Sequence, residues 1–196
     1  RRRERSAIFL RDFVDRGPEQ ERVLKIVRRM RDAGVAEAVM GNHEYNAICF
    51  ATEDPAAPGQ HLRPHSEKNH RQHRTFLEQL RAWSQAHFDW IDWFRTLPVW
   101  LERDDVRLVH ACWHPSSQAE LTPLLDGSNR LTPEGLVATS RRNTSPYQAL
   151  ETLLKGLEVP LPEGVVLHDK DGNPRTEVRV RWWHDEPLSY REGALL

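Results

Sequence analysis

The stretch AIFLRDFVDRGPEQERVLKIVRRMRDAGVAEAVMGNHEY, residues 7–45, decides the fold predicted for this chain. Residues 7–10 form a short apolar run that is long enough for a buried parallel strand. Apolar residues then recur with helical spacing over residues 23–30, and Gly34 is suited to end that helix. A second apolar run follows at residues 35–40. A strand, a helix and a strand of these lengths predict a right-handed crossover with two parallel strands.

Polar side chains follow each of the two predicted strands. They are Asp12, Asp15 and Arg16 in the first loop, and Asn42, His43 and Glu44 in the second loop. In open α/β sheets, functional sites lie beyond the carboxyl ends of the strands. The two loops are one crossover apart and can therefore face each other across neighbouring strands. The sequence predicts a single site that draws on both loops.

The residue types in these loops suit the hydrolysis of a phosphate ester. Two metal ions roughly 3.5–4 Å apart can hold the phosphoryl oxygens and activate the attacking water. Asp12 is a suitable bridge between two ions, while Asn42 and His110, which ends a later predicted strand, are suitable further ligands. His43 is placed to donate a proton to the leaving group, and Arg16 is suited to clamp a phosphate.

Two acidic residues are candidates for a supporting role. Asp15 or Glu44 is placed to hold Arg16 or His43 in orientation. Each of these clusters has a simpler interpretation as a polar turn or a helix cap. The spacing of one crossover between the two clusters favours a functional site.

Three motifs together resemble those of the calcineurin-like metallophosphoesterase superfamily: DxxDRG at residues 12–17, GNHE at 41–44 and VHA at 109–111. The sequence DRGP at residues 15–18, combined with GNHE, is similar to the protein-phosphatase-like branch. That branch includes bacterial symmetrical diadenosine-tetraphosphatases. The sequence HACW at residues 110–113 resembles a bacterial group of phosphoesterases related to diadenosine-tetraphosphatases or serine/threonine phosphatases.

The resemblance implies an α/β fold in the form of a four-layer αββα metallophosphoesterase sandwich. Residues 1–196 would form a single domain in which residues 52–98 are a helical insertion or a lid-like segment. The chain starts on Arg1 and ends on Leu196 with no obvious first or last element, so we expect the sandwich to be truncated at both ends.

The resemblance also implies a dinuclear centre of two divalent metal ions, typically manganese, iron or zinc. Asp12 would bridge the two ions, and Asn42 and His110 would bind the second ion. His43 would be the general acid and Arg16 the phosphate clamp, with Asp15 in a supporting catalytic role.

This chain departs from the family pattern in three places. No Asp-x-His motif precedes Asp12, so we expect the first metal site to be incomplete in this chain. No Gly-His pair follows His110, and His184 is a candidate for the missing ligand. Arg11 stands where the family has glycine, and there it would either repel metal ions or reach a phosphate.

The bulk composition limits the classes of partner. The formal net charge is −1, which gives no strong signal for nucleic acid. No apolar run approaches the roughly 20 residues of a membrane span, so we expect no membrane association. Two cysteines do not make a disulfide scaffold, and Cys112 is interpreted as a packing residue. We expect a cytoplasmic protein.

The remaining segments predict further helices and strands. Residues 52–64 are a predicted loop and residues 67–97 a helical segment. Strands are predicted at 99–101 and 106–109, a loop with a weak helix at 115–140, a helix at 148–157, and a hairpin that pairs 165–167 with 177–183 around the turn 171–173. A loose cluster of His61, His65, His70 and His73 is interpreted as part of a polar lid or substrate-side insertion, in preference to an extra metal site.

The sequence therefore predicts a metal-dependent phosphoesterase that hydrolyses phosphate esters or anhydrides. Its substrate would be a phosphorylated small molecule, a dinucleoside polyphosphate or a phosphoprotein, and the sequence does not choose among these. The alternative is a non-catalytic protein that binds a nucleotide or a protein partner on a degenerate phosphoesterase fold. Arg11 and the missing ligands favour that alternative.

Overall fold

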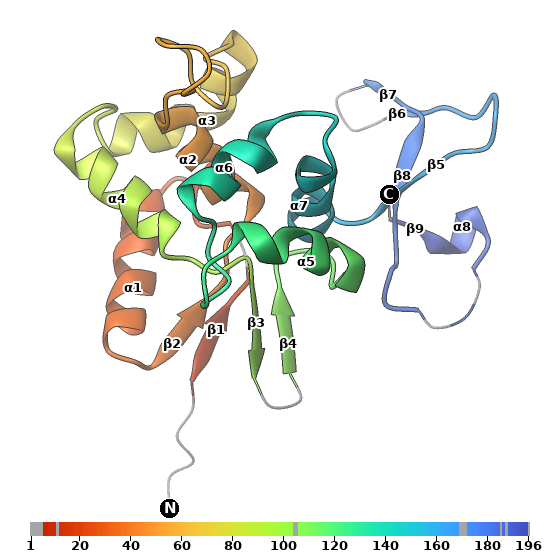
Figure 1. Ribbon diagram of the computed structural model, residues 1–196, viewed down its shortest axis with the longest axis horizontal. Helices are drawn as coiled ribbons and strands as arrows, with labels where there is room; N and C mark the ends of the chain where they lie inside the picture. Colours follow the sequence, from red (N-terminus) through yellow and green to blue (C-terminus); the bar gives the residue numbers. More distant parts are fainter. Residues whose placement is uncertain are drawn as a thin grey trace, which may run out of the picture.

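The computed structural model describes residues 6–10, 12–103, 106–168, 172–184, 186 and 188–195. Over these residues the chain has a mixed α/β fold with small sheets (Figure 1). Arg11 lies outside the described residues, and so do residues 104–105, between the strands predicted at 99–101 and 106–109, and residue 171 of the predicted turn 171–173. No helix in the described part of the chain is long and apolar enough to cross a membrane.

The predicted crossover is confirmed. Strand β1 (Ala7–Phe9) pairs in parallel with β2 (Ala36–Ala38), and helix α1 (Gln20–Asp32) connects them. The helical spacing of the apolar residues places Leu24 and Val27 on one face of the helix, and both side chains are buried.

Three helices follow β2. They are α2 (Asn42–Ala51), α3 (Glu67–Gln79) and α4 (Gln85–Arg95). The single helical segment predicted over residues 67–97 is therefore wrong, because a turn separates α3 from α4. Arg81 and Trp83 adopt left-handed backbone angles in that turn, with φ of 53° and 65°. The Ser84 side chain then accepts a hydrogen bond from the His87 backbone and starts the second helix.

The predicted pair of strands after α4 is also confirmed. Strand β3 (Trp100–Arg103) pairs antiparallel with β4 (Val106–Val109). In Figure 1 these strands lie beside β1 and β2. A hydrogen bond joins the two pairs of strands, because the Met40 N–H, just after β2, donates to the Pro98 carbonyl (2.8 Å), just before β3.

The segment predicted as a loop with a weak helix forms more regular structure than expected. It contains α5 (Pro115–Leu121), the 3-10 helix η1 (Thr122–Leu124) and α6 (Pro133–Ser140), and α7 (Ser145–Lys155) follows. Thr132 and Thr144 each accept a backbone hydrogen bond at a helix start, with proline in the first turn that follows. This pairing of cap and proline explains why α7 starts before the predicted residue 148.

The predicted C-terminal hairpin has the wrong pairing. The strands are β5 (Glu158–Pro160), β6 (Leu167–His168), β7 (Pro174–Arg175), β8 (Glu177–Val180) and β9 (Ala194–Leu195), and the short helix α8 (Tyr190–Gly193) precedes β9. Strand β6 pairs with β7, whereas β8 pairs with β5 and β9. Burial decides this, because Val178 of β8 is buried opposite Val159 of β5.

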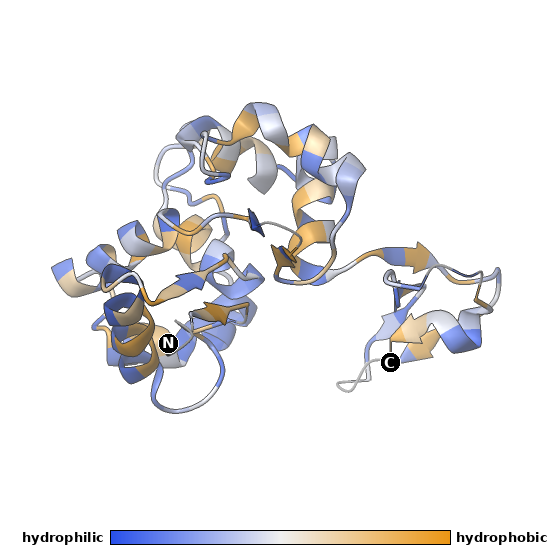
Figure 2. Ribbon diagram, turned by 90° about the horizontal axis from the view of Figure 1, so that it is seen from below, coloured by the Kyte–Doolittle hydropathy of each residue, from blue (hydrophilic) through white to orange (hydrophobic). Residues whose placement is uncertain are grey.

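The core lies among the helices and not in the C-terminal strands. Helices α1, α2, α4 and α7 supply most of the buried apolar side chains, including Leu24, Ile48, Phe94 and Leu153. Figures 1 and 2 both show the C-terminal strands standing apart from this body. The indole N–H of Trp182 donates to the Ala111 carbonyl (2.8 Å) and ties the two parts together.

Candidate active site

The loop after β1 and the start of α2 are held together by their own polar groups. The backbone N–H of His43 donates to Asp12 Oδ1 (3.2 Å). Gly41 makes this approach possible, because a Cβ atom there would lie 2.2 Å from Asp12 Oδ1 and 2.7 Å from Glu44 Oε2. Only glycine fits between these two carboxylates, so the glycine of the GNHE motif has a steric role.

Glu44 joins the two loops from beneath. It is fully buried, and its carboxylate accepts hydrogen bonds from the backbone N–H groups of Phe13 (2.7 Å) and Gly41 (3.1 Å). Burial raises the pKa of Glu44 to about 8, and the nearby negative charge of Asp12 adds to the rise. Glu44 therefore fixes the backbone of both loops through these two hydrogen bonds.

His110 brings a ring nitrogen to Asp12 from the end of β4. Its Nδ1 lies 2.5 Å from the Leu10 carbonyl oxygen, and its Nε2 lies 3.5 Å from Asp12 Oδ1. A carbonyl oxygen only accepts hydrogen bonds, so Nδ1 carries a proton. The Nε2 atom then faces a carboxylate oxygen, and a cation between the two atoms would stabilise this arrangement. A metal ion or a second proton would supply that positive charge.

The spacing of this pair fits one divalent ion. Two ligand atoms bound at about 2.1 Å with a tetrahedral angle lie about 3.4 Å apart, close to the 3.5 Å between Asp12 Oδ1 and His110 Nε2. Asn42, the predicted third ligand, is the first residue of α2 and is half-buried. Within the described residues, no three His, Cys, Asp or Glu side chains converge as a complete metal site. The residues described thus fit part of the coordination shell of one ion.

His43 and Asp15 form a hydrogen-bonded pair beside the candidate metal position between Asp12 and His110. The Nδ1–H of His43 donates to Asp15 Oδ2 (2.9 Å), and its Nε2 lies 3.8 Å from Asp12 Oδ2. Burial by itself lowers the pKa of His43, but the hydrogen bond to Asp15 and the negative charges of Asp12 and Asp15 raise it overall. Protonation is therefore easier than for a free imidazole, which suits a proton donor.

A residue that the sequence did not place in the site completes this pair. His73 of α3 is buried, and its Nδ1–H donates to Asp15 Oδ1 (2.7 Å). Burial by itself raises the pKa of Asp15, yet the hydrogen bonds from His43 and His73 lower it overall. Both carboxylate oxygens are then occupied by imidazoles, which fixes the orientation of Asp15.

Helical spacing is the signal that could have identified His73. It lies three residues before Phe76 and seven before Leu80, so it belongs to the buried stripe of α3. A histidine in an apolar stripe needs a buried partner. The other three histidines of the predicted cluster stay together near the surface: the rings of His61 and His65 stack 4.0 Å apart, and His70 contacts His65 edge-on.

The remaining predicted residues lie at the edge of the site or away from it. Arg16 is exposed in the loop between β1 and α1. Asp15 just before it adopts a left-handed backbone conformation, with φ of 63°. His184 is exposed and stacks on Trp183 in the C-terminal part, and it has no contact with Asp12 among the described residues. Cys112 is buried, as expected for a packing residue, and burial raises the pKa of its thiol.

Comparisons with protein-family models, with curated proteins and with solved structures find no match to this chain.

Proposed function

We propose that this chain is a metal-dependent phosphoesterase of the protein-phosphatase-like type, built on the four-layer αββα sandwich of the calcineurin-like superfamily. One observation carries the proposal. The Nε2 atom of His110 lies 3.5 Å from Asp12 Oδ1, a spacing that one divalent ion between the two atoms would fit. The His43–Asp15 pair lies directly beside this position and supplies a proton donor.

Each residue has a separate role in the proposed reaction. Asp12, His110 and Asn42 would hold the metal, which when bound supplies charge neutralisation for the phosphoryl oxygens and activation of water. His43 donates its Nε2 proton to the leaving oxygen, and Asp15 holds the ring through Nδ1. Arg16, which is exposed, is available to bind a phosphate oxygen of the incoming substrate.

The substrate would be a phosphorylated small molecule, a dinucleoside polyphosphate or a phosphoprotein. The geometry around Asp12 concerns only the phosphoryl group that these three classes share, so it supports phosphate hydrolysis without selecting among them. We also propose that the reaction takes place in the cytoplasm.

A non-catalytic role is the second candidate. It is favoured by the lack of a complete three-ligand cluster in the described part of the chain. In that case the site would bind a phosphorylated ligand or a protein partner without turning it over.

Replacing Asp12 separates these two candidates. The full-length protein and its Asp12→Asn variant would be titrated with manganese by isothermal calorimetry. Both would then be assayed with p-nitrophenyl phosphate and diadenosine tetraphosphate. We expect manganese-dependent turnover in the parent protein and a loss of about 10²-fold or more in the variant, since the metal is displaced or misplaced.

Asp92→Asn is the matched control, because the Asp92 side chain is 77% exposed on α4. It should bind manganese and turn over substrate as the parent protein does. Manganese binding without turnover in the parent protein would support the non-catalytic role. Turnover that is unchanged in Asp12→Asn would overturn the proposed function.

A further inference from the structure

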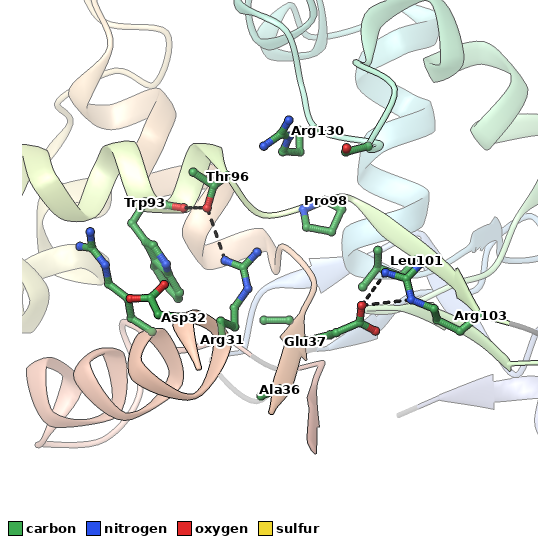
Figure 3. Close-up of a pocket in the computed structure, with 13 residues that line it drawn as sticks. Arg31, Asp32, Ala36, Glu37, Trp93, Thr96, Pro98, Leu101, Arg103 and Arg130 are labelled. Atoms are coloured by element: carbon green, nitrogen blue, oxygen red, sulfur yellow. Dashed lines mark hydrogen bonds and ion pairs between the residues drawn. The ribbon is translucent and has the colours of Figure 1, made fainter. Parts of the chain in front are cut away.

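A second charged site lies outside the candidate active site. It is a pocket of about 560 Å³ between the last turns of α1, strand β2, the connection from α4 to β3, and residues 128–130 (Figure 3). None of its lining residues belongs to the Asp12 site. The volume is within the roughly 300–1,000 Å³ that is usual for small-molecule pockets.

Positive charge dominates the lining. It includes the arginines Arg28, Arg31, Arg103 and Arg130 together with the carboxylates of Asp32 and Glu37. Two of these arginines already have acidic partners. Arg103 Nε donates to Glu37 Oε1 (3.0 Å), and Arg130 Nε donates to Asp126 Oδ2 (2.8 Å). The lining therefore holds more positive than negative charge after these pairs are formed.

Arg31 is the half-buried cation at the centre of this lining. Its guanidinium carbon lies 5.6 Å from the centroid of the Trp93 ring, and Nη1 donates to Thr96 Oγ1 at 3.4 Å. A guanidinium has five N–H donors, so one long hydrogen bond leaves most of them for a ligand. Figure 3 shows the guanidinium reaching toward Thr96, with Arg130 approaching from another segment of the chain.

The electrostatics of Arg31 agree with this geometry. Burial lowers its pKa; the carboxylates of Asp32 and Glu37 oppose that effect, and the positive charge of Arg130 adds to it. The fold thus holds Arg31 where its own charge is disfavoured by desolvation and by a second guanidinium. A bound anion would offset the cost of the desolvation and the repulsion between the two guanidiniums.

We infer that this pocket binds a small, multiply charged oxyanion, such as the phosphate or pyrophosphate group of a phosphorylated metabolite. Arg31 and Arg130 would be its principal ligands, because planar guanidiniums pair with phosphate oxygens through two hydrogen bonds at once. The Trp93 ring lies against the Arg31 guanidinium at a distance suited to a cation–π contact. The inference goes beyond the proposed function, since it needs neither a metal nor the residues of the active site.

The test uses the indole N–H of Trp93 as a local reporter. The full-length protein carrying Asp12→Asn would be labelled with ¹⁵N and kept in excess EDTA, so that the active site does not compete. Pyrophosphate, inorganic phosphate and chloride would then be titrated in turn at constant ionic strength. The chain has 7 tryptophans, and the spectrum of Trp93→Phe would assign the Trp93 signal.

We expect a saturable shift of the Trp93 signal with pyrophosphate, a weaker response to phosphate and none to chloride. Arg31→Gln should weaken pyrophosphate binding by about tenfold or more, the loss that follows from removing a charge-assisted hydrogen bond. Arg29→Gln is the matched control, because this substitution removes the same positive charge from the exposed face of α1. It should bind as the parent does.

Two results would overturn the inference. One is a Trp93 signal that does not move with pyrophosphate. The other is an equal loss in Arg29→Gln and Arg31→Gln, which would indicate general attraction by helix charge. Near-ultraviolet circular dichroism shows whether Arg31→Gln folds. If it does not fold, pyrophosphate binding is measured with Arg31→Lys instead. Lysine keeps the charge but not the planar pair of donors, so intermediate affinity is expected, and unchanged affinity would contradict the assigned role.

Discussion

The two charged sites of this molecule use the same strand–helix–strand unit in opposite ways. The Asp12 site brings together carboxylates and imidazoles that follow the ends of β1, β2 and β4. The arginine pocket gathers guanidiniums from the last turns of α1, from β3 and from the loop at residue 130. The first arrangement suits a cation and the second an anion.

The two sites also differ in what fixes them. Around Asp12, backbone groups hold the two loops together: Gly41 leaves room for two carboxylates, and Glu44 accepts from the backbone of both loops. In the arginine pocket, side chains hold one another, as Arg31 does with Thr96 and Arg103 with Glu37. We therefore expect substitutions in the first site to affect fold and activity together. Substitutions in the second should affect binding alone.

The largest expected effect comes from Gly41→Ala. The new Cβ would overlap Asp12 Oδ1 at 2.2 Å, so the carboxylate must move. We expect a loss of about 10²-fold in metal-dependent turnover, which a displacement of about 1 Å can produce. A destabilisation on the order of 1–3 kcal/mol should accompany it, measured by urea unfolding.

Gly127→Ala is the control for that prediction, because nothing lies within 4 Å of a Cβ placed at Gly127. It should leave both turnover and unfolding within experimental error of the parent protein. An active and stable Gly41→Ala protein would show that the two loops are not held by their backbones, and the contrast with the arginine pocket would then fail.

A smaller effect is expected from His73, which holds Asp15 and through it His43. His73→Phe keeps a ring in the buried stripe but removes the hydrogen bond to Asp15 Oδ1. Loss of such an orienting partner typically costs about 10–100-fold in activity. We expect the loss to appear in kcat and not in KM, measured with p-nitrophenyl phosphate.

His73→Asn distinguishes orientation from packing. The asparagine amide can donate near the position of the imidazole Nδ1, so part of the lost kcat should return even though the ring is absent. If Phe and Asn lower kcat equally while the folded fraction is unchanged, His73 does not act by orienting Asp15.

The smallest effect concerns His87, a buried imidazole outside both charged sites. Neither ring nitrogen has a hydrogen-bond partner among the described residues, and its pKa falls from 6.5 to about 4 through burial and, secondarily, through the charge of His73. The pKa of His87 is lower in the folded state than in the unfolded state. The neutral ring therefore contributes its full stability at pH values above the unfolded-state pKa. This stability is lost as the pH falls from 6.5 toward 4.

We expect the free energy of unfolding to drop between pH 7 and pH 5 by about 2 kcal/mol more in the parent protein than in His87→Leu. Urea unfolding at the two pH values measures the difference. This result sets the baseline against which pH effects at the Asp12 site are to be judged. Equal pH dependence in the two proteins would contradict the assignment.

The sequence predicted the elements that depend on local patterns. The parallel pair β1–β2 with α1 between them follows from apolar runs and helical spacing, and the strands β3 and β4 follow from two short apolar runs. The break between α3 and α4 was missed because Arg81 and Trp83, both L-residues, adopt left-handed angles that neighbouring residue types do not signal. The pairing of β8 was missed because the choice between β5 and β6 depends on distant burial.

By itself, the sequence determined which chemistry is available: carboxylates, an amide and imidazoles at the ends of predicted strands, where a crossover brings them to one edge. Tertiary structure alone decided how they are used. It placed the Nε2 of His110 against Asp12, joined His73 to Asp15 over a separation of 58 residues, and gathered arginines from α1, β3 and the loop at residue 130 into one pocket. Contacts of this kind depend on packing between distant segments, and no local pattern of residues encodes them.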